Sequence, residues 1–251
     1  MGSVHTFGDP LIRLLSTTST NDVARDLARQ GAPEGTVVVA DYQTAGRGRM
    51  GRRWLAPPGT SLLCSLLFRP HPEHARDLPF LCALAAADAV EKVAGLSVAL
   101  KWPNDLIVVR GEGWRKLGGI LAETEVSGGQ VEFVVVGIGI NVNVPPEVLP
   151  SLSPEATSIL AETGRETDRE QLLIALLEQT DLLYRQLRAG QRPFAQWVTR
   201  LATLGQEVRL STVEGEWCGI AEAVDEEGAL LLRTPDGALR RVLVGDVLRA
   251  H

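Results

Sequence analysis

The stretch TSLLCSLLF, residues 60–68, constrains the fold more than any other part of the chain, because it is apolar on both of its alternating faces. A strand with one face in water alternates apolar and polar residues, whereas a strand buried on both faces reads as a nearly continuous apolar run. We therefore predict that residues 60–68 form a central strand of a sheet.

Apolar periodicity and turn residues predict the other elements around this strand. The expected strands are residues 36–41, 98–102, 105–109, 116–126 and 131–144, the last two joined as a hairpin. The expected helices are residues 19–31, a helix that begins at the sequence TDRE, and a short helix over residues 193–201. Within TDRE, Thr167 and Glu170 fit a capping box.

Residues 78–100 are the most apolar long stretch of the chain. Asp88, Glu91 and Lys92 interrupt it, so it lacks the roughly 20 uninterrupted apolar residues that a membrane span needs. We predict a buried helix that ends near Gly95 and is followed by a strand, and no membrane association.

The pattern changes after Gly205, where short strands alternate with the turn sequences VEGE, DEEG and PDG and helical periodicity is lost. This pattern is typical of a small, partly open β-barrel. We predict an α/β (α+β) main domain over residues 1–204, in which a mixed sheet is flanked by helices. A small β-barrel domain is expected over residues 205–251.

The charge balance limits the partners that the chain can have. Its 251 residues carry a formal net charge of −6, which argues against nucleic acid, because many Lys and Arg contacts to phosphate drive that binding. The three cysteines are far apart and no secretory signal opens the chain, so we expect it in a reducing cytoplasm.

One segment departs from this acidic background: QTAGRGRMGRRW, residues 43–54, which we call the arginine loop. Its arginines are Arg47, Arg49, Arg52 and Arg53, and its glycines are Gly46, Gly48 and Gly51. Glycine lets the backbone bend tightly and approach a ligand, and arginine grips phosphate with a planar fork of donors. Trp54 offers a flat face for an adenine ring. By itself the loop fits a solvated basic loop, a nucleic-acid contact or a clamp for a small polyanion.

Two further segments carry polar groups next to strands. KWPNDL, residues 101–106, places a lysine, an amide and a carboxylate around a proline turn, and in isolation it fits a simple strand connection. KLGGILAE, residues 116–123, places a lysine at the start of a strand with two glycines, and in isolation it fits a solvated edge lysine before a bulge.

In combination and in this order, these segments resemble the biotin protein ligases. The resemblance rests on STN at Ser19, the arginine loop, KWPNDL, KLGGILAE and GIGINVN at Gly137, and it covers the chain from about Ser19 to its end. It implies a class II synthetase-like catalytic domain, as in biotin and lipoate ligases, followed by an SH3-like barrel. Met50 stands where relatives often have a basic residue. The eighteen residues before Ser19 are too few for the DNA-binding domain of some relatives, so we expect a single-function ligase without DNA binding.

The resemblance also implies a reaction in two steps. The carboxylate of biotin attacks the α-phosphate of ATP, giving biotinyl-5′-AMP and pyrophosphate. A lysine of a biotin carboxyl carrier protein domain, part of a biotin-dependent carboxylase, then displaces AMP. The first step brings two anions together, so positive charge is needed where charge develops. Mg²⁺ is expected to be bound mainly by the ATP phosphates, with Asp105 as a candidate ligand. The small-polyanion clamp is therefore the preferred interpretation of the arginine loop.

The resemblance assigns roles to single residues. The expected catalytic residues are Lys116, Arg47, Arg49 and Asp105. The expected biotin-binding residues are Ser19, Thr20, Asn21, Gln43, Arg47, Gly48, Arg49, Lys116 and Gly118. The expected ATP-binding residues are Arg49, Arg52, Trp54, Asn104, Lys116 and Asn141.

Several alternatives stay open at this point. The nearest is a lipoate–protein ligase, which shares the adenylation chemistry, and a more distant one is a non-catalytic RNA-binding protein. Asp105 could bind metal, or it could orient or deprotonate the incoming lysine. An edge strand of the main sheet could support a homodimer, although nothing in the sequence demands one.

Overall fold

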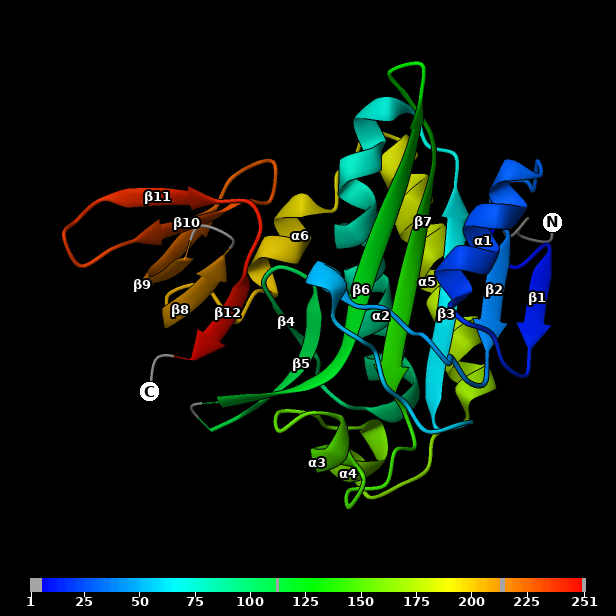
Figure 1. The fold of residues 1–251 in the computed structure, drawn as a ribbon, viewed down its shortest axis with the longest axis horizontal. Helices are drawn as coiled ribbons and strands as arrows, with labels where there is room; N and C mark the ends of the chain where they lie inside the picture. Colours follow the sequence, from blue (N-terminus) through cyan, green and yellow to red (C-terminus); the bar gives the residue numbers. More distant parts are fainter. Residues whose placement is uncertain (1–5, 112, 213–214, 250–251) are drawn as a thin grey trace.

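The computed structural model describes residues 6–111, 113–212 and 215–249. Within them, seven strands form the main sheet in the order β1-β2-β3-β7-β6-β5-β4 (Figure 1). These strands are β1 (Leu11–Leu14), β2 (Val37–Ala40), β3 (Ser61–Phe68), β4 (Ala99–Lys101), β5 (Asp105–Arg110), β6 (Gly113–Ser127) and β7 (Gln130–Asn141). β1 pairs with β2 in parallel and the other neighbours pair antiparallel, so the predicted mixed sheet is confirmed.

The predicted central strand is confirmed. β3 lies between β2 and β7, and all eight of its residues are buried. Leu66 belongs to the large apolar cluster on one face of the sheet, and its neighbour Leu67 belongs to a separate cluster on the other face. The two-residue period of a strand thus sends successive side chains of the apolar run into two different cores.

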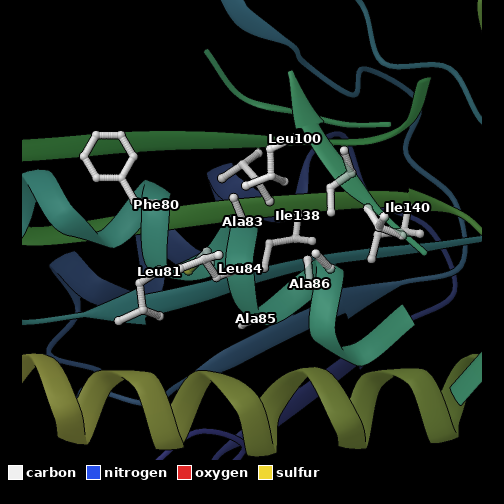
Figure 2. Packing of buried hydrophobic residues seen from close by; sticks show 14 of the residues in the cluster. Phe80, Leu81, Ala83, Leu84, Ala85, Ala86, Leu100, Ile138 and Ile140 are labelled. Atoms are coloured by element: carbon white, nitrogen blue, oxygen red, sulfur yellow. The ribbon is translucent and has the colours of Figure 1, made fainter. Parts of the chain in front are cut away.

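Helices cover both faces of this sheet. α1 (Thr20–Arg29) contributes Ala24 and Ala28 to the smaller apolar cluster, whereas α2 (Leu78–Ala94) and α5 (Arg169–Arg188) pack in the larger one. Figure 2 shows Ala83, Leu84 and Ala86 of α2 close to Ile138 of β7. α2 ends as predicted at Gly95, which has the left-handed φ of 66°. No helix among the described residues has the length and apolar character needed to cross a bilayer.

Two details of the sequence prediction fail. The capping box at Thr167 and Glu170 is wrong, because α5 begins one residue later and Asp168 is its cap. The Asp168 carboxylate accepts hydrogen bonds from the backbone N–H groups of Glu170 and Gln171. A carboxylate is a strong N-cap acceptor, so it competes successfully with the neighbouring threonine. The short elements β1, α3 (Leu149–Leu152) and α4 (Ile159–Thr163) were not predicted.

The C-terminal strands form the expected all-β unit. A short helix, α6 (Phe194–Thr199), precedes them. The described strands form an antiparallel sheet in the order β11-β10-β9-β8-β12, at the left of Figure 1. They are β8 (Glu207–Thr212), β9 (Gly215–Val224), β10 (Leu230–Arg233), β11 (Leu239–Val242) and β12 (Asp246–Arg249). The indole N–H of Trp102 donates to the carbonyl oxygen of Gly228 at 2.8 Å, which fixes this sheet against the turn between β4 and β5.

Candidate active site

A cavity of about 340 Å³ lies where segments far apart in the sequence meet: the start of α1, the arginine loop, the β4–β5 turn, β6, β7 and β12. Thirteen of the fourteen predicted site residues line it. They are Ser19, Thr20, Asn21, Gln43, Arg47, Gly48, Arg49, Arg52, Trp54, Asn104, Asp105, Lys116 and Asn141. The exception is Gly118, which is buried in β6, where an added Cβ atom would meet the carbonyl oxygen of Gly139 at 2.6 Å. Its neighbour Gly119 lines the cavity instead.

The start of α1 presents a hydroxyl group to the cavity. Ser19 is the N-cap residue of α1, yet its side chain makes no capping hydrogen bond. The side-chain carbonyl of Gln43 serves instead, accepting from the backbone N–H of Thr20 at 2.7 Å and from its hydroxyl at 3.0 Å. Because the arginine loop supplies the cap, the Ser19 hydroxyl is left for a ligand.

Asn21 is held in one orientation by its neighbours. Its side-chain N–H groups donate to Glu123 at 2.7 Å and to the carbonyl oxygen of Leu121 at 3.3 Å. Its side-chain oxygen lies 2.6 Å from the hydroxyl of Ser65, a buried residue of β3. Gly137 makes room for this amide, since a Cβ atom there would meet the oxygen at 2.4 Å. Counting its partners within the described ranges, the amide keeps one unused acceptor position and no unused donor.

The arginine loop folds back on itself as a small hairpin. The backbone N–H of Gly48 donates to Arg52, and that of Trp54 donates to Gly46, at 2.8 and 2.9 Å. A Cβ atom on Gly46 would meet the carbonyl oxygen of Trp54 at 2.7 Å, so glycine is required there. Met50 takes the left-handed φ of 53° at the tip.

The four arginines of this loop have different surroundings. Arg47 contacts Asp22 at 2.6 Å and Glu123 at 3.2 Å, and this pairing lowers the pKa of Asp22 and raises that of Arg47. Arg52 pairs with Asp246 of β12. Arg53 donates to a carbonyl oxygen of the loop itself, at Thr44. The sequence could not distinguish Arg47, which is neutralised inside the protein, from arginines that remain available for an anion.

Arg49 differs from the other three. Among the described residues its guanidinium group has no hydrogen-bond or ion-pair partner, although it is partly buried in the cavity wall. Burial lowers the pKa of Arg49, and the charges of Asp246 and Asp105 oppose this effect. A partly buried guanidinium group without a counter-ion is a favourable site for an incoming anion.

The indole of Trp54 lies across β7. A Cβ atom on Gly139 would meet its ring atoms at 2.8 Å, so Gly137 and Gly139, two residues apart on one face of β7, make room for two different site residues. The buried indole N–H has no hydrogen-bond partner among the described residues. The ammonium group of Lys116 lies 5.8 Å from the centre of the ring. A planar ligand beside Trp54 would therefore lie close to a cation.

Asp105 joins two lysines. Its carboxylate oxygens lie 2.6 Å from the ammonium nitrogen of Lys116 and 3.2 Å from that of Lys101. Lys101 and Asp105 are opposite each other in the β4–β5 ladder, which brings their side chains to the same place. Lys101 opens the KWPNDL segment, but it was not among the predicted site residues.

The two predicted asparagines use their side-chain N–H groups within the protein. That of Asn104 donates to the carbonyl oxygen of Ile120 at 2.6 Å, and that of Asn141 donates to the carbonyl oxygen of Thr157 at 2.9 Å. Both therefore shape the cavity wall, whatever their contact with a ligand.

A protein-held metal ion does not fit these surroundings. Among the described residues, no group of three or more His, Cys, Asp or Glu side chains is arranged to hold a metal. Asp105, the carboxylate that the sequence suggested for Mg²⁺, already contacts an ammonium group with each oxygen.

Residues 12–141 match the biotin/lipoate A/B protein ligase family, and residues 203–249 match the biotin protein ligase C-terminal domain.

Individual relatives agree with these matches. The chain is 38% identical over 233 residues to a biotin–[acetyl-CoA-carboxylase] ligase of Paracoccus denitrificans, covering 89% of this chain and 94% of the relative. It is 36% identical over 235 residues to the bifunctional ligase/repressor BirA of Bacillus subtilis, covering 92% of this chain and 71% of the relative. The solved structure of a biotin protein ligase from Aquifex aeolicus in complex with biotin and ATP is similar with a TM-score of 0.77. That alignment is 29% identical and covers 96% of this chain and 99% of the other.

Proposed function

The chain belongs to the biotin/lipoate A/B protein ligase family and is an ATP-dependent biotin ligase, and from this premise we propose which residues act on each substrate. One observation carries the assignment. A wall of buried, neutral hydrogen-bonding groups and a wall of cationic groups face the same cavity. Biotin has a neutral ureido ring system at one end and a carboxylate at the other, so it matches both walls.

The neutral wall binds the ureido head. The hydroxyl of Ser19, the side-chain N–H groups of Gln43 and the unused acceptor position of Asn21 are the groups offered, while Thr20 is tied to Gln43. Arg47 and Gly48 also line the cavity, and Gly119 takes the place that was expected of Gly118. A neutral urea gains little from charge, so fixed donors and acceptors must supply the specificity.

The cationic wall serves the first step. An oxygen of the biotin carboxylate attacks the α-phosphorus of ATP, the bond to the β-phosphate breaks, and pyrophosphate leaves. Lys116 moves from Asp105 to the reacting carboxylate and phosphate, and Arg49 binds the phosphate from the arginine loop. These groups reduce the repulsion between the two anions and stabilise the charge that develops. Mg²⁺ is expected to arrive with the ATP phosphates, and no step here depends on it.

The assignment gives Arg47 a different role from the catalytic one that its motif suggested. Its guanidinium group is held by Asp22 and Glu123, so it anchors the arginine loop to α1 and β6. Arg52 and the indole of Trp54 face the nucleotide, with Asn104 and Asn141 behind them. Trp54 lies within the cavity wall and beside Lys116, which supports adenine stacking at this place.

The second step requires a protein substrate. We propose that a lysine amine of a biotin carboxyl carrier protein attacks the activated carbonyl carbon of biotinyl-5′-AMP, so that an amide forms and AMP leaves. Support comes from the name of the Paracoccus denitrificans relative, a biotin–[acetyl-CoA-carboxylase] ligase. The amine must lose a proton, and Asp105 is a carboxylate of the cavity whose side chain contacts Lys116 directly.

We also propose that residues 1–204 form the catalytic domain and residues 205–251 a separate C-terminal domain. The change from the mixed sheet to the antiparallel sheet supports a boundary near Gly205. The two units nevertheless share one apolar cluster, to which β8, β9, β10 and β12 all contribute. They are therefore expected to unfold together.

The two alternative functions, a lipoate–protein ligase and a non-catalytic RNA-binding protein, are less well supported. The named relatives and the C-terminal match favour biotin over lipoate. For RNA binding, the C-terminal sheet would need a basic face, but Arg233 pairs with Glu222, and Arg241 pairs with Asp225 and Glu227.

The function is tested by incubating the full chain with ATP, Mg²⁺ and biotin, and in parallel with lipoate. Biotinyl-5′-AMP retained on the protein, detected by mass spectrometry, is the expected product. Pyrophosphate release with lipoate but not with biotin would move the chain to the other branch. Pyrophosphate release with neither biotin nor lipoate would contradict both ligase functions.

A further inference from the structure

The buried carboxylate of Asp105 has two lysine counter-ions, Lys116 and Lys101. Lys116 has a proposed role in adenylation, and Lys101 has none so far. We propose that Lys101 is a positioning residue: it neutralises Asp105 when Lys116 leaves to meet the substrates. The inference rests on the proposed role of Lys116 in adenylation.

The two lysines are held differently. The Lys101 side chain is 10% exposed, and its ammonium group also donates to the carbonyl oxygen of Val247 in β12 at 3.3 Å. The Lys116 side chain is 33% exposed and faces the cavity beside Trp54. Lys101 is therefore fixed by both Asp105 and the C-terminal sheet. Lys116 has Asp105 as its only ion-pair partner among the described residues, so breaking that one contact lets it turn into the cavity.

Gly119 leaves open space beside Lys116. A Cβ atom at this position would lie 3.7 Å from both the Cε atom and the ammonium nitrogen of Lys116, and 3.7 Å from Asp105. β6 thus carries no side chain beside the Lys116–Asp105 ion pair, and even a Cβ atom there would make only ordinary contacts with it.

Electrostatics gives Lys101 its function. Asp105 is 8% exposed, and a carboxylate at such a site is costly unless a counter-ion stays close. When Lys116 turns toward the carboxylate of biotin and the α-phosphate, Asp105 would be left unpaired next to two further anions. Lys101 remains on the other oxygen and avoids this. Without Lys101, Lys116 would be the only direct ion-pair partner of Asp105 among the described residues, with Arg49 acting from farther away, and it would be held there.

The test is a double-mutant cycle on the full-length protein with Lys101→Met, Asp105→Asn and the combined variant. The readout is the single-turnover rate of biotinyl-5′-AMP formation from saturating biotin and ATP, without carrier protein, so that the second step does not contribute. Lys92→Met is the control for loss of a lysine charge. Lys92 lies near the C-terminal end of α2, outside the cavity lining, in an exposed ion pair with Glu178. Binding of biotinol, which has the ureido head but no carboxylate, checks that each variant is folded.

Lys101→Met is expected to slow adenylation on the order of tenfold, since groups in one ionic network typically couple by that much. In the Asp105→Asn background the same substitution should cost almost nothing, because no carboxylate remains to retain Lys116. Lys92→Met should match the parent.

Two results would overturn the proposal. One is an unchanged adenylation rate in Lys101→Met while the parent enzyme is active. The other is an equal loss with and without the Asp105 carboxylate, which would mean that Lys101 acts on the substrate directly or only on the fold. An inactive parent would instead reject the ligase function itself.

Discussion

The two walls of the cavity are built in opposite ways. On the neutral wall, Ser19, Thr20 and Asn21 are each 3% exposed, and hydrogen bonds to Gln43, Ser65 and Glu123 fix this wall. On the cationic wall, Arg49 has no ion-pair partner in the part of the chain that the structure describes, and the two lysines at Asp105 differ in exposure.

This difference matches the two ends of the substrates. A neutral urea is recognised by groups that are already in place, because ordering them on binding would cost affinity. The cationic wall must accept charge that changes during the reaction. Besides Arg47, which pairs with Asp22 and Glu123, the cavity is lined by five cationic side chains and three carboxylates, so positive charge is in excess for the polyphosphate. The cations are Lys101, Lys116, Arg49, Arg52 and Arg53, and the carboxylates are Asp105, Glu155 and Asp246.

The largest effect is expected from Lys116→Ala on the cationic wall. It should lower the adenylation rate by about 10²- to 10³-fold, as the loss of a group that stabilises developing charge typically does. Stability should change little, because Lys101 still pairs with Asp105 and the lost side chain is partly exposed. Single-turnover biotinyl-5′-AMP formation and the Tm measure the two effects. Adenylation at the parent rate with saturating substrates would remove Lys116 from the mechanism.

Arg49→Gly should leave formation of biotinyl-5′-AMP largely intact and impair its retention on the enzyme. Biotinyl-5′-AMP is a reactive mixed anhydride, and we propose that Arg49, which has no ion-pair partner among the described residues, binds its phosphate after pyrophosphate leaves. We expect the variant to form the adenylate but to release it about 10- to 100-fold faster, the loss expected for a charged hydrogen bond. Bystander proteins should then become biotinylated.

The control for this variant is Arg53→Gly, which adds the same glycine flexibility to the same loop. Its guanidinium group contacts only the carbonyl oxygen of Thr44 among the described residues. A release rate from Arg49→Gly that equals those of the parent and the control would show that Arg49 does not retain the adenylate.

The sequence predicted the elements around the cavity well, and physical reasons explain this. The apolar run of β3 and the glycine after α2 are local signals that tertiary structure did not override. The four-residue strand β1 carries too few residues for a clear period, so it was missed. The α5 cap was misplaced because two adjacent residues, Thr167 and Asp168, can both act as caps.

For the site, the motifs identified the residue types but not their partners. The pairing of Arg47 with Glu123 joins segments 76 residues apart, and the contact between Lys101 and Val247 spans 146. No local pattern encodes such distances. The alternate glycines Gly137 and Gly139 were a usable signal, since glycine at every second position of a strand indicates close approach on one face.

A smaller effect is expected from Ser65→Ala, which tests whether the neutral wall is preformed. The substitution removes the hydroxyl that contacts Thr20 at 2.7 Å and Asn21 at 2.6 Å, without touching the cavity itself. Biotin binding should weaken about fivefold to tenfold, the effect of one buried hydrogen bond. Isothermal titration calorimetry with biotinol measures this without the carboxylate.

Ser61→Ala is the matched control for that prediction. Ser61 is buried on the same strand, but its hydroxyl faces Asn141 at 3.5 Å, away from the neutral wall. It should bind biotinol like the parent. Equal weakening in both variants would mean that β3 packing, and not the contact with Asn21, determines affinity.

The smallest effect is expected in the hydrogen exchange of backbone amides. Measuring it in the arginine loop and in α1 compares the two walls directly. The arginine loop is closed by few backbone hydrogen bonds, such as Gly48 to Arg52 and Trp54 to Gly46. Among the described residues, its Arg49 has no ion-pair partner until an anion binds. Amides of residues 46–54 should therefore exchange more slowly when biotin and ATP are bound. Those of α1 should change much less, since Gln43 already caps that helix without ligand. Biotin alone should protect the loop less than both substrates together, because ATP brings most of the negative charge. Equal protection of the loop with and without both ligands, in hydrogen–deuterium exchange, would contradict the idea that the cationic wall is completed by its substrates.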